Sequence, residues 1–281
     1  MYKFIQDKSI DDFLKNAGPL LYRDEVANSL MLGLCEGMVG NPSKISPLLF
    51  RVLQEDETVT AAIQTPPKNL VISYAKPDVL DILILALQKI EADFPGVVGP
   101  NKESEYFSDR WSRLVAKKTR LAMGQKIYRL DQVKFPKNID GSFGMANSEQ
   151  TQIVHDWVMA FVNESLPPNE VRDAQHWGDF ACRAVQKKAA HFWMQNNKPV
   201  SMAFVSRPTK NGISVNGVYT PPEFRKKGYA SAVVSHLSQK MLDSGQKFCV
   251  LYTDLSNPTS NKIYQEIGYR EVCDSKHFFF E

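Results

Sequence analysis

The sequence predicts an α/β fold in two domains, and three observations lead to this expectation. The chain has 281 residues, which is too long for one small core and suits two domains of ordinary size. Hydrophobic residues make up 43% and charged residues 23%, close to the globular average, so each half can bury a core. Segments with strand and helix patterning alternate along the chain, and one order of these elements occurs twice.

The N-terminal half begins with helical patterning. Ile10, Phe13 and Leu14 recur at helical spacing, and a second helix is expected from Glu25 to Met38. Pro77 suits the first turn of a later helix. The elements expected after residue 47 are a strand at 48–54, a turn at 55–58, strands at 59–65 and 70–74, a helix at 77–94, a strand at 96–99 and a helix at 103–117.

The C-terminal half repeats this order. Its expected elements are a strand at 127–130, helices at 148–163 and 169–186, strands at 190–195, 200–205 and 213–219, a helix at 229–244, a strand at 248–252, a helix at 257–267, and closing strands at 269–272 and 278–280. Phe278, Phe279 and Phe280 are expected to complete the edge of a core. The repeat predicts one domain over 1–125 and a second over 126–281.

Charge and cysteine usage exclude several classes of protein. The net charge of +3 is too small to indicate a nucleic-acid partner, because such binding depends on clustered Lys and Arg. The four cysteines, Cys35, Cys182, Cys249 and Cys273, include no Cys-x-x-Cys pair, so no zinc site and no disulfide framework are expected. A reduced, cytoplasmic setting fits this usage.

Neither a membrane span nor a metal site is expected. The start of the chain, from Met1 to Asp7, has no apolar signal core, and the longest apolar run, near 79–87, is short and carries Asp81. The histidines form no metal-ligand spacing; they are His155, His176, His191, His236 and His277.

The segment from Val218 to Ser231 carries the clearest chemical signal. It joins a strand to a helix, and Pro221 and Pro222 stop the strand. A basic run and Gly228 then fall at the helix start, where unpaired N–H groups and the positive dipole end attract phosphate. Gly228 and the small Ala230 would let backbone approach a bulky anion.

The run Arg225-Lys226-Lys227-Gly228-Tyr229-Ala230 resembles the Arg/Gln-x-x-Gly-x-Gly/Ala pattern of the GCN5-related N-acetyltransferase (GNAT) family. The resemblance spans roughly residue 127 to the end. It implies a mixed, mostly antiparallel sheet flanked by helices, with splayed central strands, in the C-terminal domain. It also implies that the loop binds the pyrophosphate of coenzyme A, while the strand end offers backbone groups to the pantetheine arm. The implied cofactor-binding residues here are Val218, Tyr219, Thr220, Arg225, Lys226, Lys227, Gly228, Tyr229, Ala230 and Ser231.

A second stretch, from Asn257 to Tyr269, is similar to the family's Asn-x-x-Ala/Ser-x-x-x-Tyr-x-x-x-Gly-Phe/Tyr pattern. Asn257 followed by Pro258 is a good N-cap with Pro at N1, and Gly268 suits the helix end. By resemblance, Asn257 also hydrogen-bonds coenzyme A and Tyr264 protonates the departing thiolate. A tyrosine hydroxyl holds its proton at neutral pH, so it is a sensible general acid.

The implied reaction is direct attack of an amine on the thioester of acetyl-CoA in a ternary complex, with proximity supplying much of the acceleration. An N–H near Val218 would stabilise the oxyanion. The base is left open between a water relay and Glu223, since the strand 213–219 contains no carboxylate. Transfer of a longer acyl group, acylation of an amino acid and a non-catalytic coenzyme A-binding regulator remain alternatives. The acceptor amine and the oligomeric state are not predicted.

The N-terminal half lacks the phosphate motif. Its third strand is followed by Ala75-Lys76-Pro77-Asp78, without glycine or a basic run, and Asp78 stands where an anion would bind. A degenerate GNAT-like domain that shapes the acceptor cleft is therefore expected there.

Overall fold

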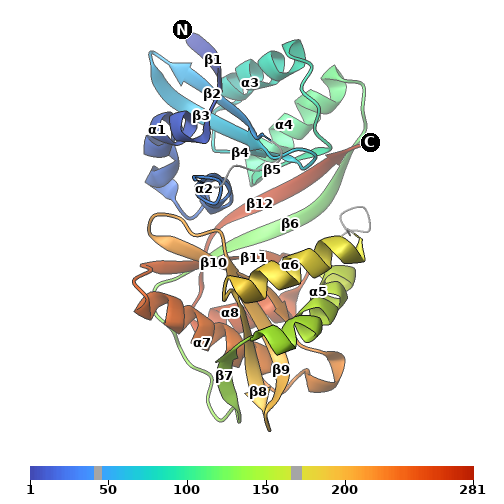
Figure 1. Cartoon of the computed structure of the whole chain (residues 1–281). Helices are drawn as coiled ribbons and strands as arrows, with labels where there is room; N and C mark the ends of the chain where they lie inside the picture. Colours follow the sequence, from blue (N-terminus) through green and yellow to red (C-terminus); the bar gives the residue numbers. More distant parts are fainter. Residues whose placement is uncertain (41–45, 166–172) are drawn as a thin grey trace.

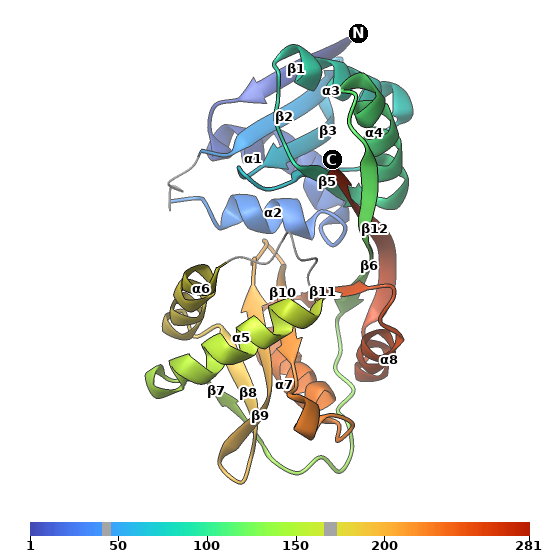
Figure 2. The ribbon, with the colours of Figure 1, turned by 90° about the vertical axis from the view of Figure 1, so that its right-hand side faces the viewer.

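A computed structural model describes residues 1–40, 46–165 and 173–281. Two units lie one above the other (Figure 1), and a single sheet of twelve strands runs through both. The strand order is β1-β2-β3-β4-β5-β12-β6-β11-β10-β9-β8-β7. The two long strands β6 and β12 lie at the centre of this order and connect the units, as the turned view in Figure 2 also shows.

The N-terminal unit contains five of the strands, packed against helices. Its elements are β1 (Tyr2–Asp7), α1 (Ile10–Leu21), α2 (Ser29–Glu36), β2 (Leu48–Gln54), β3 (Glu57–Gln64), β4 (Leu70–Ile72), α3 (Pro77–Lys89), β5 (Gly96–Pro100) and α4 (Asn101–Leu114). Helices α3 and α4 pack on one face around Leu83, Phe107 and Trp111. Helices α1 and α2 cover the other face.

The rest of the chain forms the C-terminal unit and the strands shared with its neighbour. Its elements are β6 (Thr119–Leu130), β7 (Ser142–Met145), α5 (Thr151–Ser165), α6 (Ala174–Gln186), β8 (Ala190–Gln195), β9 (Lys198–Ser206), β10 (Gly212–Tyr219), α7 (Tyr229–Asp243), β11 (Phe248–Asp254), α8 (Pro258–Ile267) and β12 (Arg270–Phe280). Helix α7 packs on one face of the sheet, and α5 and α6 pack on the other.

The repeated order of elements is present in both units. The series β2-β3-β4-α3-β5-α4 matches β8-β9-β10-α7-β11-α8. Strands β1 and β7 were not expected, and β6 is longer than the four residues foreseen. For the helix expected at 169–186, α6 accounts for Ala174–Gln186, while residues 169–172 lie outside the described part.

Strand β12 corrects the expectation of two short closing strands. The polar residues Asp274, Ser275 and Lys276 lie between the two expected ranges, yet β12 is continuous because it pairs with β6 along its length and with β5 over Ser275–Phe279. Lys126 of β6 forms ion pairs with Asp274 at 2.9 Å and with Glu271 at 3.0 Å, which neutralises the acidic side chains on the strand. Tertiary pairing thus overrides the local polar pattern.

The end of β12 belongs to the core of the N-terminal unit. Phe280 is 7% exposed and lies edge-on to Phe94, with ring centroids 6.0 Å apart. This confirms that the terminal phenylalanines complete a core. The expected boundary between residues 125 and 126 falls inside β6, a strand that both units share.

The two units are also joined by hydrogen bonds at the loop between β9 and β10. The carboxylate of Glu25, just before α2, accepts hydrogen bonds from the Thr209 hydroxyl at 2.6 Å and from the Asn211 amide nitrogen at 2.8 Å. The side-chain nitrogen of Asn211 donates to its other oxygen at 2.7 Å. This contact fixes α2 over the C-terminal unit.

Candidate active site

The strands β10 and β11 pair over a short stretch and then separate. Their parallel register joins Gly212 to Phe248, Ile213 to Cys249 and Ser214 to Val250, and it ends there. On its other side, β10 shifts register against β9 between Asn216 and Tyr219. The described ladders therefore leave Gly217 and Val218 without partners, and their backbone groups are available at the opening between the strands.

Gly217 makes this irregularity possible. Its φ is 56°, and a Cβ added there would lie 2.5 Å from Cδ2 of Phe204. A larger residue would meet both the left-handed backbone penalty and this ring. Sequence reasoning placed the opening correctly but missed Gly217, although a glycine inside a strand pattern is a signal for a bulge.

The segment after β10 ends in a helix start rich in unpaired donors. A short 3₁₀ turn at Pro222–Phe224 leads to Gly228, which precedes α7 as its N-cap with φ 79°. Within the described chain, none of the backbone amides from Lys226 to Ser231 donates a hydrogen bond. Unpaired amides at the positive end of a fifteen-residue helix are suited to hold an anion.

Glycine is required at position 228 for a different reason from the one expected. A Cβ on Gly228 would point at Ile139 and lie 2.4 Å from its Cδ1. Gly228 is therefore needed for its positive φ and its close packing on Ile139. The expectation that it opens space for an anion is corrected to this extent.

The basic side chains of the loop are partly engaged. Arg225 donates to both oxygens of Glu164 at 2.9 and 2.7 Å and to the carbonyl of Thr220 at 2.9 Å. Lys227 donates to the carbonyl of Glu223 at 3.2 Å, while Lys226 is exposed. The pair with Glu164 holds Arg225 beside the loop, and sequence reasoning gave no sign of it because Glu164 lies in α5.

The side chains of the expected site residues divide between two cores. Val218 and Tyr229 pack into the cluster under α7, and the hydroxyl of Tyr229 donates to Gln195. Tyr219 instead packs on the opposite face with Trp157. Tyr219 and Tyr229 can therefore serve a ligand through backbone atoms, while Thr220 uses its hydroxyl in a 2.9 Å hydrogen bond to Ser201.

Helix α8 borders the same cluster. The side-chain oxygen of Asn257 accepts from the Ser260 amide at 3.1 Å, which confirms the expected N-cap. Asn261, which sequence reasoning missed, ties this helix to the sheet: its side-chain oxygen accepts from Thr253 at 2.7 Å and from Tyr128 at 3.1 Å. It lies one turn after Asn257, a spacing that could have identified it.

Tyr264 has the properties of a proton donor. Its ring is half-buried against Tyr269, with centroids 6.0 Å apart, and burial raises the pKa of its hydroxyl to about 12. No described residue forms a hydrogen bond with that hydroxyl, so it can form one with a ligand. Val218 packs against the same hydrophobic cluster as Tyr264.

Two carboxylates, the candidate base Glu223 and Asp254, follow the ends of the strands that border the opening. Glu223 is exposed within the 3₁₀ turn. Asp254, at the end of β11, accepts a hydrogen bond from the Ser256 amide at 2.8 Å, which shapes the turn into α8. Neither contact identifies a general base.

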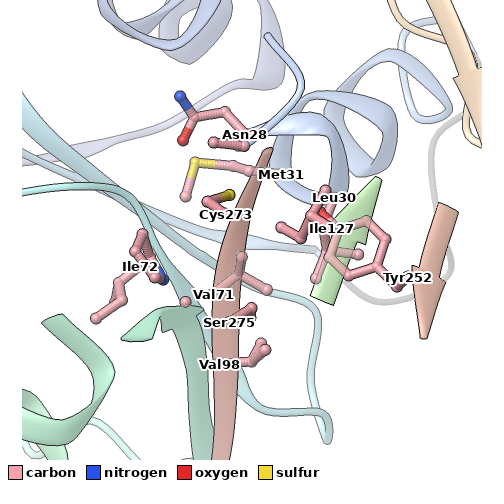
Figure 3. Close-up of a pocket in the computed structure, with 13 residues that line it drawn as sticks. Asn28, Leu30, Met31, Val71, Ile72, Val98, Ile127, Tyr252, Cys273 and Ser275 are labelled. Atoms are coloured by element: carbon pink, nitrogen blue, oxygen red, sulfur yellow. The ribbon is translucent and has the colours of Figure 1, made fainter. Parts of the chain in front are cut away.

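The corresponding place in the N-terminal unit is filled. Residues of α2, β4, β5, β6, β11 and β12, with Ala27 and Asn28 before α2, line a cavity of about 20 Å³ beside β4 and β5 (Figure 3), which is room for about one water. A Cβ on Gly99 of β5 would lie 2.5 Å from the side chain of Ile72, so that side chain covers β5 just beyond the β4–β5 ladder, whose last pair is Val71 with Val98. At the start of α3, the Asp78 carboxylate accepts from the Tyr2 hydroxyl at 2.7 Å.

Two further properties concern the described residues as a whole. Within them, no three His, Cys, Asp or Glu side chains are grouped so that they could hold a metal ion. None of the described helices combines the length and apolar character needed to cross a bilayer.

Comparisons with known proteins agree with this geometry. The family model described as "FR47-like protein" matches residues 197–278, from β9 to β12. A GCN5-related N-acetyltransferase from Sphaerobacter thermophilus superposes with a TM-score of 0.63 at 12% identity, covering 99% of this chain and 95% of that one. This chain has the GNAT fold. The family resemblance and the mixed, mostly antiparallel sheet expected from the sequence are thereby confirmed.

Other solved structures show that the GNAT fold extends over both units. A GNAT-family acetyltransferase from Colwellia psychrerythraea gives a TM-score of 0.59 at 13% identity, covering 99% of each chain. A tandem GNAT protein from the clavulanic acid biosynthesis pathway gives 0.56 at 10% identity, covering 100% of this chain and 98% of that one. A search among curated proteins finds no match.

Proposed function

We propose that this protein is an N-acetyltransferase that moves the acetyl group of acetyl-CoA to the amine of an acceptor. The observation that supports this most is the row of unpaired amides from Lys226 to Ser231, directly after a strand that parts from its neighbour. These donors fit the pyrophosphate of coenzyme A. A loop with paired amides would have argued against such a ligand.

Each residue contributes a step that follows from its surroundings. Bound acetyl-CoA would supply an activated acyl thioester. The backbone at Gly217 and Val218, unpaired in both ladders, can donate to an oxygen on which negative charge develops. The Tyr264 hydroxyl holds its proton at neutral pH and can give it to a sulfur that leaves with negative charge.

We also propose that the N-terminal unit binds no coenzyme A. The side chain of Ile72 lies against Gly99 there, and the Asp78 carboxylate lies at the positive end of α3. A carboxylate at that point repels phosphate. One coenzyme A per chain, measured by calorimetry, is the expected stoichiometry, and two would refute this part of the proposal.

The experiment that tests the function measures release of free thiol from acetyl-CoA against a broad panel of amines. Thiol release is expected with one class of amine. Tyr264→Phe should lower the turnover number by roughly 100-fold, the usual contribution of a general acid, while the acetyl-CoA affinity stays the same. Tyr106→Phe is the matched control, because the Tyr106 hydroxyl donates to Asp81 in the N-terminal unit and should not affect turnover.

Three results would count against the proposal or a part of it. Acetyl-CoA binding without thiol release from any amine would favour a coenzyme A-binding regulator. Faster release from a longer acyl thioester would favour a different acyl donor. An unchanged turnover number in Tyr264→Phe would remove Tyr264 from the mechanism.

A further inference from the structure

Arg207 lies where the two units meet, in the loop that joins β9 to β10. Its backbone has φ 49°, an uncommon conformation for arginine. A Cβ added to Gly33 of α2 would lie 2.5 Å from Cβ of Arg207 and 2.9 Å from its carbonyl oxygen. Together with the hydrogen bonds that Glu25 accepts from Thr209 and Asn211, this packing fixes the conformation of the loop.

The guanidinium of Arg207 has no hydrogen-bond or ion-pair partner in the described chain. Its Nε is buried and makes no hydrogen bond. The two terminal nitrogens also form no hydrogen bond or ion pair with a described residue, and they are not fully buried. Burial lowers the pKa of this guanidinium. An enclosed, unpaired charge is unfavourable for folding, so its presence calls for a ligand.

The carboxylates on neighbouring elements are occupied elsewhere. Glu25 uses both oxygens for Thr209 and Asn211. Glu36, on α2, accepts from the Tyr22 hydroxyl at 2.6 Å. Asp254, on β11, accepts from the Ser256 amide. The described residues therefore pack around Arg207, but none of these carboxylates pairs with its guanidinium.

The guanidinium lies at the opening between β10 and β11. The Cζ atom of Arg207 is 5.9 Å from the centroid of the Tyr252 ring. Tyr252 is the second residue after Val250, the last residue of β11 paired with β10. Leu251 packs under α7, and since side chains alternate along a strand, Tyr252 and Arg207 lie on the opposite face. That face is the one remote from the amides of α7.

The Tyr252 side chain is held in place. Its hydroxyl shares a 3.1 Å hydrogen bond with Ser29 of α2. On β10, Asn216 donates to Ser206, the residue before Arg207. Helix α2 of the N-terminal unit thus covers part of this face, and Arg207 of the C-terminal unit presents a cation beside it.

We infer that Arg207 binds a carboxylate of the acceptor, so that the acceptor carries an acid group close to its amine, as amino acids and short peptides do. This rests on the proposed acetyltransferase function. Cofactor phosphate would reach the α7 amides from one face, and the acceptor would reach the opening from the other. A guanidinium suits a carboxylate because its fork of donors binds both oxygens.

The test compares amino acids with their amides, which have the same shape and amine but no carboxylate charge. In thiol release from acetyl-CoA, kcat/KM should favour the acids by roughly 10- to 100-fold, the effect of hydrogen bonds to a charged group. In Arg207→Gln this ratio should fall towards one. Lys210→Gln is the matched control, since it removes an exposed positive charge from the same loop.

A second readout needs no turnover. Calorimetry with N-acetyl amino acids should show binding that Arg207→Gln weakens and Lys210→Gln leaves intact, with unchanged acetyl-CoA affinity in both. Equal use of acids and amides by the wild-type protein, or a ratio unaffected by Arg207→Gln, would overturn the inference. If acetyl-CoA is bound but no amine is acetylated, the proposed function fails, and the calorimetric result still decides the role of Arg207.

Discussion

The replacement of Gly228 by alanine probes the phosphate loop most directly. Gly228 precedes α7 with φ 79°, and its missing Cβ faces Ile139. Alanine in this conformation is strained by roughly 1–2 kcal/mol. The added carbon would also lie 2.4 Å from Cδ1 of Ile139, the flexible end of that side chain, so Ile139 or the loop must shift.

The magnitude of the binding loss follows from this strain. If the free loop relaxes away from the left-handed conformation, acetyl-CoA must restore it before the amides can meet the phosphates. The affinity should then fall by the strain itself, about 1–2 kcal/mol or roughly 5- to 30-fold. The free energy of unfolding of the free protein should drop by less than this, because the relaxed loop no longer carries the whole strain.

Gly245 offers a control with the same kind of strain. It follows the other end of α7 with φ 101°, and a Cβ there would meet nothing within 4 Å. Gly245→Ala should lower the free energy of unfolding by about 1 kcal/mol and leave acetyl-CoA binding unchanged. Calorimetry gives the affinities and urea unfolding the stabilities. Equal affinity losses in both variants, or none in Gly228→Ala, would refute the reasoning.

Two further predictions concern charge. Glu164→Gln should release Arg225 for the cofactor and tighten acetyl-CoA binding up to about fivefold at low salt, a gain that high salt should abolish; weaker binding would contradict it. His191 is 1% exposed, and burial, aided by Lys240, lowers its pKa to about 4, so it is neutral in the folded protein. In the unfolded chain the His191 imidazole takes up a proton as the pH falls below 6.5, whereas in the folded protein it stays neutral down to about pH 4. The free energy of unfolding therefore decreases between pH 6.5 and 4. From pH 7 to 5 the loss should be about 2 kcal/mol in urea unfolding, and His191→Gln should remove it; an equal loss in the variant would show that His191 is not its source.

The sequence alone determined the features that depend on a few consecutive residues. The helix start at Gly228, the N-cap at Asn257 and the end of α8 at Gly268 follow from backbone conformations that only certain residues adopt. The repeated order of strands and helices follows from local periodicity in the same way. These signals also predicted the GNAT fold, since its motifs occupy such positions.

The tertiary structure decided everything that depends on residues far apart in the chain. The continuity of β12 comes from pairing with β5 and β6, which its polar centre does not reveal. The pairing of Arg225 with Glu164 and the isolation of Arg207 beside Gly33 join segments whose own sequences carry no trace of each other. Local conformation is set by neighbours along the chain, whereas register, burial and the pairing of charges are set by whichever surfaces the fold brings together.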